Sequence, residues 1–183
     1  MTEKKNHTPK EQPWFLVQTK PNAEALAFSN LENQEITAFM PLHKITRRKA
    51  SKFQTILRPL FPGYVFISIE FNSILWQKVK NTRGVTRVVR FGPEPSQVPS
   101  KVLNELLAYC DTDGIFQREE KFGIGVNIQI KEGPLAGVIG NIININPKKR
   151  IQILFDFMGQ TSTLKVDASV LKDRKSTRLN SSH

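Results

Sequence analysis

The residue types that perform most enzymatic chemistry are few in this sequence and lie far apart. There is one cysteine, Cys110, and the three histidines are His7, His43 and His183. A catalytic thiol needs a base beside it, and a metal site needs several ligands at short spacing. The sequence shows no such grouping, its carboxylates are scattered, and it has no glycine-rich phosphate motif. We therefore expect a protein that is not an enzyme and that uses neither a metal ion nor a cofactor.

The basic residues, in contrast, are concentrated in one third of the chain. The 183 residues carry a net charge of +11. Between Ile36 and Pro93 there are eleven lysines and arginines and one acidic residue, Glu70. Such clustering is typical of a surface that meets nucleic acid phosphates or an acidic partner; a solvated basic surface would give the same composition. The eleven are Lys44, Arg47, Arg48, Lys49, Lys52, Arg58, Lys78, Lys80, Arg83, Arg87 and Arg90.

The segment Arg58–Ile69 is expected to lie at the centre of the fold. Two prolines and Gly63 predict a rigid turn, and a strand rich in β-branched and aromatic residues follows. Alternate side chains of a strand point to opposite faces. Val65, Ile67 and Ile69 would face one way, and Tyr64 and Phe66 the other. Since both faces are apolar, one fills a core, and the other is covered by the protein's own helices, a second domain or another protein.

The pattern up to position 110 predicts a mostly antiparallel sheet with helices packed on it. The expected strands are Trp14–Thr19, Ile36–Leu42, the strand that begins at Tyr64, and Val85–Phe91. The expected helices follow Asn22, Asn72 and Pro99, with the two asparagines as N-caps. The basic segment His43–Leu57 is expected to form an exposed hairpin or loop.

The second half of the chain has a different pattern. Residues 111–121 are partly acidic and weakly periodic, so we expect a linker there. Residues 122–173 contain short runs of period two separated by turn residues and glycines, which predicts a small closed β-barrel. The runs are Val126–Ile130, Ile151–Phe157 and Leu164–Val166.

Neither end of the chain is expected to belong to a folded domain. Residues 1–12 are polar and are predicted to be disordered. Residues 174–183 continue neither pattern and resemble a translated sequencing-adapter tail; excluding their three basic residues lowers the net charge from +11 to +8. The sequence has no secretion signal and no run of ~18 apolar residues, so we expect a cytoplasmic protein without a membrane contact.

Several separated motifs resemble the NusG family of transcription elongation factors, in that family's order, across residues 13–172. In the first half they are Trp14–Thr19, Arg58–Phe66 and Asn81–Val85, and in the second half Gly125, Glu132–Pro134, Ala136, Gly137 and Gly140. The resemblance implies an α+β protein. Its N-terminal domain, residues 13–110, would be a NusG-like sandwich, and residues 122–173 would be a KOW barrel.

The resemblance also implies a function. The N-terminal domain would bind the clamp helices of RNA polymerase, suppress pausing by holding the clamp closed, and promote antitermination. By position, the apolar pocket for the clamp helices would consist of Phe61, Tyr64 and Phe66. Thr82–Thr86 and Val89–Gly92 look more like the specialised RfaH-type paralogues, which also contact the non-template DNA strand. Lys20, Thr82 and Arg83 fall on the matching DNA-binding positions.

The KOW domain implies a further partner. In the general factor it recruits the termination factor Rho or a ribosomal small-subunit protein. In RfaH-type proteins it starts as a helical hairpin that masks the polymerase site and later refolds to the barrel. Here the alternating residues and the bend glycines favour the barrel.

Two other functions fit parts of the sequence. The chain could be the general NusG factor that couples polymerase to Rho or the ribosome. It could also be a ribosome-type KOW RNA-binding protein, which would carry basic and aromatic residues on its barrel strands. The charge lies mainly in the first domain instead. In each case we expect a monomer.

Overall fold

An antiparallel sheet is the centre of the structure. In the computed structural model, which describes residues 12–117, 139 and 142–159, its strand order is β2-β5-β1-β6, and β7 pairs with the other end of β1. The strands are β1 (Trp14–Thr19), β2 (Thr37–Phe39), β5 (Tyr64–Ser68), β6 (Val85–Val88) and β7 (Gln97–Val98). Trp14 lies opposite Ser68, and Gln18 lies opposite Tyr64. This confirms the α+β class for the N-terminal domain.

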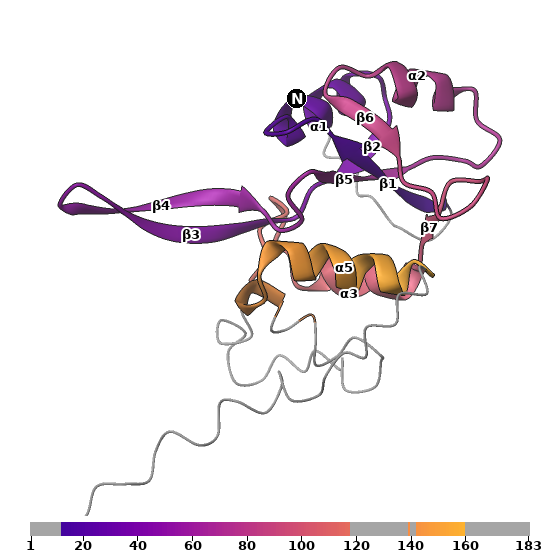
Figure 1. Cartoon of the computed structure of the whole chain (residues 1–183). Helices are drawn as coiled ribbons and strands as arrows, with labels where there is room; N and C mark the ends of the chain where they lie inside the picture. Colours follow the sequence, from indigo (N-terminus) through magenta and orange to yellow (C-terminus); the bar gives the residue numbers. More distant parts are fainter. Residues whose placement is uncertain (1–11, 118–138, 140–141, 160–183) are drawn as a thin grey trace, which may run out of the picture.

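The two faces of the sheet are both covered by helices, as Figure 1 shows. On one face, Phe15, Val65 and Ile67 pack against α1 (Glu24–Asn33) and α2 (Leu75–Asn81). On the other face, Leu16 and Phe66 pack against α3 (Ser100–Ala108) and α5 (Pro147–Phe157). The expected alternation in β5 is therefore confirmed, because its odd and even residues lie in separate cores.

The three helices expected in the N-terminal domain form, but two of their expected caps were wrong. Asn22 has a φ of 56° and precedes the N-cap residue, Ala23. Helix α2 begins with Ile74 as its N-cap, and its first amide, on Leu75, donates to the hydroxyl of Ser73 rather than to Asn72. The asparagines thus lie in the turns before the helices.

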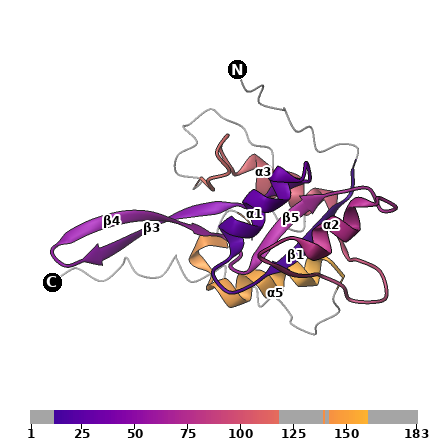
Figure 2. The same ribbon diagram turned by 90° about the horizontal axis from the view of Figure 1, so that it is seen from above.

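The basic segment forms a long hairpin, which is one of the two structures expected for it. Strands β3 (Leu42–Lys49) and β4 (Lys52–Pro59) pair along their whole length, from Leu42 opposite Pro59 to Lys49 opposite Lys52. They make a sheet of their own and extend away from the rest of the molecule (Figures 1 and 2). We call this hairpin the ribbon.

The first residues of the expected linker pack on the N-terminal domain. The amide of Phe116 donates to the carbonyl of Leu42 at 2.7 Å, and the ring of Phe116 stacks on Tyr109 with centroids 5.4 Å apart. The amide of Leu42 donates to the carbonyl of Gly114 at 2.9 Å. The chain therefore packs on the N-terminal domain as far as Gln117. Residues 118–121 lie outside the described residues.

The strand expected at Ile151–Phe157 was wrong, because these residues belong to helix α5. Asn146 is its N-cap and accepts a hydrogen bond from the amide of Lys149 at 2.9 Å, and Pro147 occupies the first turn. A short 3₁₀ helix, Ile142–Asn144, precedes it. The other two expected barrel strands lie outside the described residues.

No helix among the residues that the structure describes is long and apolar enough to cross a bilayer.

Candidate functional site

The three aromatic residues expected to bind polymerase lie together at the start of β5. Phe66 is fully buried in the sheet, and the ring of Phe61 meets it edge-on with centroids 5.8 Å apart. Tyr64 is half-buried two residues before Phe66 on the same face. We call Phe61, Tyr64 and Phe66 the aromatic face.

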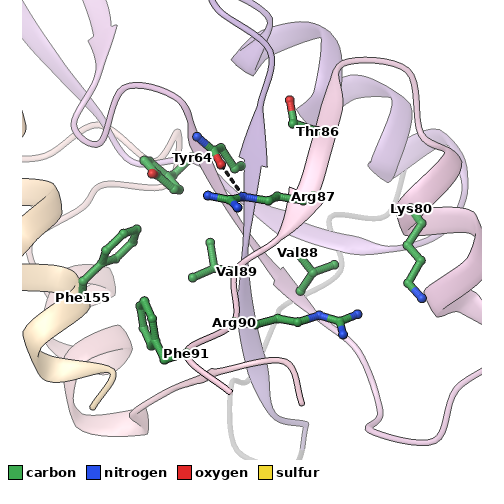
Figure 3. Close-up of a pocket in the computed structure, with 10 residues that line it drawn as sticks. Tyr64, Lys80, Thr86, Arg87, Val88, Val89, Arg90, Phe91 and Phe155 are labelled. Atoms are coloured by element: carbon green, nitrogen blue, oxygen red, sulfur yellow. Dashed lines mark hydrogen bonds between the residues drawn. The ribbon is translucent and has the colours of Figure 1, made fainter. Parts of the chain in front are cut away.

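Helix α5 covers the aromatic face. The ring of its Phe155 meets Tyr64 edge-on with centroids 5.3 Å apart, and it meets Phe91 in the same way at 5.2 Å. Ile153 and Leu154 line a small cavity together with Phe61. Figure 3 shows Phe155 projecting from α5 toward Tyr64 and Phe91. Apolar contacts of this kind stabilise a docked helix roughly in proportion to the apolar area they remove from water, about 25 cal/mol per Å².

A buried arginine fixes α5 to the base of the ribbon and to the turn before β5. Arg150 is 4% exposed. Its Nε donates to the carbonyl of Ile145 at 2.7 Å, and its Nη1 donates to the carbonyl of Leu60 at 2.8 Å. Nη1 also lies 3.4 Å from Nε2 of His43. No carboxylate pairs with this guanidinium among the described residues, so its charge is satisfied by carbonyl oxygens and by the imidazole.

The environment of His43 favours its neutral form. Burial, together with the adjacent Arg150 guanidinium, lowers the pKa of His43 from 6.5 to about 4. A guanidinium can only donate, so the contact with Nε2 is a hydrogen bond only when that nitrogen carries no proton. Burial likewise lowers the pKa of Arg150 from its ordinary value. The pair therefore consists of a charged donor and a neutral acceptor.

A hollow of about 470 Å³ opens beside Tyr64, between the sheet edge and α5 (Figure 3). Its walls combine rings and cations. Arg87 crosses it and donates from Nε to the side-chain oxygen of Gln18 at 2.7 Å. Burial raises the pKa of the Tyr64 hydroxyl, and the charge of Arg87 acts against that rise. The residues that line it are Gln18, Tyr64, Lys80, Thr86, Arg87, Val88, Val89, Arg90, Phe91 and Phe155.

Two of the three expected DNA-binding residues are exposed neighbours, and the third is buried. Lys20 and Arg83 are both exposed, and the amide of Lys20 donates to the carbonyl of Gly84 at 2.8 Å. Thr82 is 4% exposed. Its hydroxyl donates to the carbonyl of Lys78 at 2.7 Å and accepts from Gln34 at 2.9 Å, so it fixes the end of α2.

The turn that carries Arg83 depends on a glycine. Gly84 has a φ of +98°, where other residues are strained, and a Cβ there would lie 2.9 Å from the backbone nitrogen of Ala27. The side-chain amide of Asn30 donates to the carbonyl of Arg83 at 3.1 Å. Helix α1 therefore holds this turn in place beside Lys20.

The sequence interpretation missed the residues that cover the aromatic face. The period-two run predicts a barrel strand for Phe155, and no sequence pattern links Arg150 with His43. Asn146 followed by Pro147 is a helix-start signal, since asparagine caps helices and proline is common at their first position. That signal indicated α5, but the period-two run from Ile151 obscured it.

The comparisons with known proteins agree on one family. A family model described as "Transcription termination factor nusG" matches residues 12–107. The "Transcription termination/antitermination protein NusG" of Halalkalibacterium halodurans is 26% identical over 170 residues, which cover 86% of this chain and 96% of that protein.

Two further relatives carry the same description. The protein of Thermus thermophilus is 25% identical over 179 residues, with 85% of this chain and 95% of that protein covered. The protein of Staphylococcus aureus is 25% identical over 166 residues, with 84% and 91% covered. The chain belongs to the NusG family of transcription termination and antitermination factors.

Proposed function

We propose that this protein is a transcription elongation factor whose N-terminal domain binds the clamp helices of RNA polymerase through the aromatic face. The observation that carries the proposal is the packing of α5 on Tyr64 and Phe61. A face that accommodates one amphipathic helix has the shape and the apolar character to accept a helix of a partner. When bound there, the factor would suppress pausing and promote antitermination.

In this proposal α5 is a cover that must leave before polymerase binds. The rings of Tyr64 and Phe155 contact each other directly, and Phe61 is 2% exposed. Two helices cannot occupy one face at the same time, so only molecules in which α5 is undocked can bind polymerase. The apparent affinity for polymerase falls in proportion to the fraction of such molecules. A covered face favours the specialised RfaH-type reading over the general factor.

The C-terminal half would then act in a second form. The alternation of Ile151, Ile153 and Phe155 fits a strand, although these residues are helical in the covered state. We infer that residues 122–173, once released, take the KOW barrel form and recruit Rho or a ribosomal small-subunit protein. The exposed pair Lys20 and Arg83 would meanwhile contact the non-template DNA strand.

Reconstituted transcription with purified polymerase tests this proposal. The template carries a pause site and a Rho-dependent terminator, and the full chain is compared with its Tyr64→Ala variant. Faster elongation with read-through of the terminator, lost in Tyr64→Ala, is the expected result. Enhanced termination by Rho would favour the general factor instead. Polymerase binding by this face would be overturned if neither the wild type nor an Arg150→Met variant, in which α5 is loosened, had any effect on transcription.

A further inference from the structure

The ribbon carries positive charge without any compensating acid. Between Leu42 and Pro59 there is no aspartate or glutamate. All six of its lysines and arginines are exposed, and none of them forms an ion pair within the part of the chain that the structure describes. They are Lys44, Arg47, Arg48, Lys49, Lys52 and Arg58.

The pairing of the two strands brings like charges together at the tip. Lys49 lies directly opposite Lys52 across the ladder, and Arg47 is two residues before Lys49 on the same face. Like charges directly opposite each other destabilise a strand pair. An anion bound at the tip would remove that repulsion, so the tip is arranged for a polyanionic partner rather than for the stability of the free protein.

The opposite face of the ribbon is also cationic. Arg48 lies there, and its cross-strand partner is Phe53, whose side chain is 76% exposed. With eight residues in each strand at ~3.3 Å per residue, the ribbon is ~26 Å long. A two-stranded ribbon fits the major groove of B-form DNA, which is ~12 Å wide and is bordered by a phosphate backbone on each side. Cations on both faces suit that position.

We propose that the ribbon is a binding element for duplex DNA, separate from Lys20 and Arg83, with its tip residues Arg47, Arg48, Lys49 and Lys52 on the phosphates. Single-stranded nucleic acid is a poorer match, since proteins bind it with several stacking rings in a basic groove, and Phe53 is the one aromatic residue of the ribbon. Duplex RNA is poorer too, because its major groove is too narrow to be read. The exposed Phe53 ring could contact base edges such as the thymine methyl.

Fluorescence anisotropy with the full chain and a labelled 30-base-pair DNA duplex tests the proposal across a range of salt concentrations. One variant replaces the four tip residues by glutamine: Arg47→Gln, Arg48→Gln, Lys49→Gln and Lys52→Gln. The matched control removes four exposed charges elsewhere: Lys78→Gln, Lys101→Gln, Lys148→Gln and Lys149→Gln. Both variants have the same net charge, so only the position of the lost charge differs.

The tip variant is expected to bind the duplex at least about tenfold more weakly and to reduce the slope of log K against log salt by ~3 to 4, since each phosphate contact contributes ~0.9. The control should bind within about threefold of wild type. Equal losses in the two variants, or no binding by wild type, would overturn the proposal. So would equal or tighter binding of the single strand, of an RNA duplex or of polyglutamate. The assay contains no polymerase, so its failure would leave the proposed function untouched.

Discussion

The Nη1 of Arg150 donates to the backbone carbonyl of Leu60 at 2.8 Å, across 90 residues of sequence. Leu60 immediately precedes Phe61, so the bond joins the covering helix to the segment that carries the aromatic face. A hydrogen bond from a charged donor is stronger than a neutral one, and an unpaired buried carbonyl is costly. Arg150 therefore determines how firmly α5 is docked.

Replacement of Arg150 by methionine should loosen α5. Met keeps an apolar stem of similar length, but it leaves the carbonyls of Leu60 and Ile145 without their donor. Docking of α5 should weaken by about 2 kcal/mol, which raises the open-to-closed ratio roughly 30-fold. Native-state hydrogen exchange of the α5 amides measures this change, and polymerase affinity should rise with it.

Lys149→Met is the control for that experiment. Lys149 is the exposed neighbour of Arg150, and only its backbone amide takes part in the cap with Asn146. Exchange in α5 should be the same as in wild type. If Arg150→Met also left the exchange of α5 unchanged, the role given to the guanidinium would be wrong.

Acid should destabilise the folded protein through His43. Its pKa is about 4 in the folded protein and 6.5 in the unfolded chain, so the unfolded chain binds the extra proton between these values. The stabilisation is complete above pH 6.5 and is lost as the pH falls toward 4. Within this window stability should fall by up to ~1.4 kcal/mol per pH unit from this residue.

His43→Gln isolates that contribution. A glutamine carbonyl can accept from Arg150 and does not titrate. Denaturant unfolding at pH 7 and pH 5 should show a smaller loss of stability in the variant than in wild type. Equal losses would show that other groups cause the acid sensitivity.

Tyr64→Ala should abolish polymerase binding while the domain stays folded. Tyr64 is half-buried, and its ring contacts Phe155, so the substitution also loosens the cover. A loss of affinity of at least about tenfold, despite a looser cover, would show that the ring itself binds the partner. Ile74→Ala, at a residue 85% exposed on the other side of the sheet, is the control and should bind normally.

Phe66→Ala is a poorer probe of binding. Phe66 is fully buried beneath Phe61 and Phe39, so its truncation should cost ~3 to 5 kcal/mol of folding stability. Thermal unfolding measures this cost directly. A normal melting temperature would mean that the site repacks.

Neutralising Lys20 and Arg83 should reduce the salt dependence of single-stranded DNA binding. Each phosphate contact contributes ~0.7 to the slope for a single strand, so the double variant Lys20→Gln, Arg83→Gln should lower it by ~1.4. Thr82→Val should behave differently. It breaks the bonds with Lys78 and Gln34, which costs about 1 kcal/mol of stability, and it leaves the slope unchanged. An unchanged slope in the double variant would remove Lys20 and Arg83 from the DNA-facing residues.

The sheet of the N-terminal domain could be predicted because its signals are local. The alternation of apolar residues from Tyr64 to Ile69 assigns these side chains to two faces without reference to the rest of the chain, and the structure confirms both faces. The ribbon was predicted less fully. Its charge was evident from composition, but its length and its separation from the sheet depend on how β3 and β4 pair.

The DNA-binding positions show the limit of sequence position as a guide. The resemblance gives Lys20, Thr82 and Arg83 the same role, yet Thr82 is buried and the adjacent Arg83 is exposed. Exposure in a turn depends on what packs against it. Here the side-chain amide of Gln34, at the end of α1, donates a hydrogen bond to the Thr82 hydroxyl.

The sequence by itself determined the strands that begin at Trp14, Tyr64 and Val85, the two apolar faces of the central strand and the location of the positive charge, because side-chain alternation and composition act within a few residues. Only the tertiary structure decided that Ile151–Phe157 is helical and covers the aromatic face. The period-two alternation of these residues fits a strand, whereas the cap residue Asn146 fits the start of a helix. Intrinsic helix and strand propensities differ too little to decide between the two. The choice follows from contacts distant in sequence, those of Arg150 with Leu60 and of Phe155 with Tyr64.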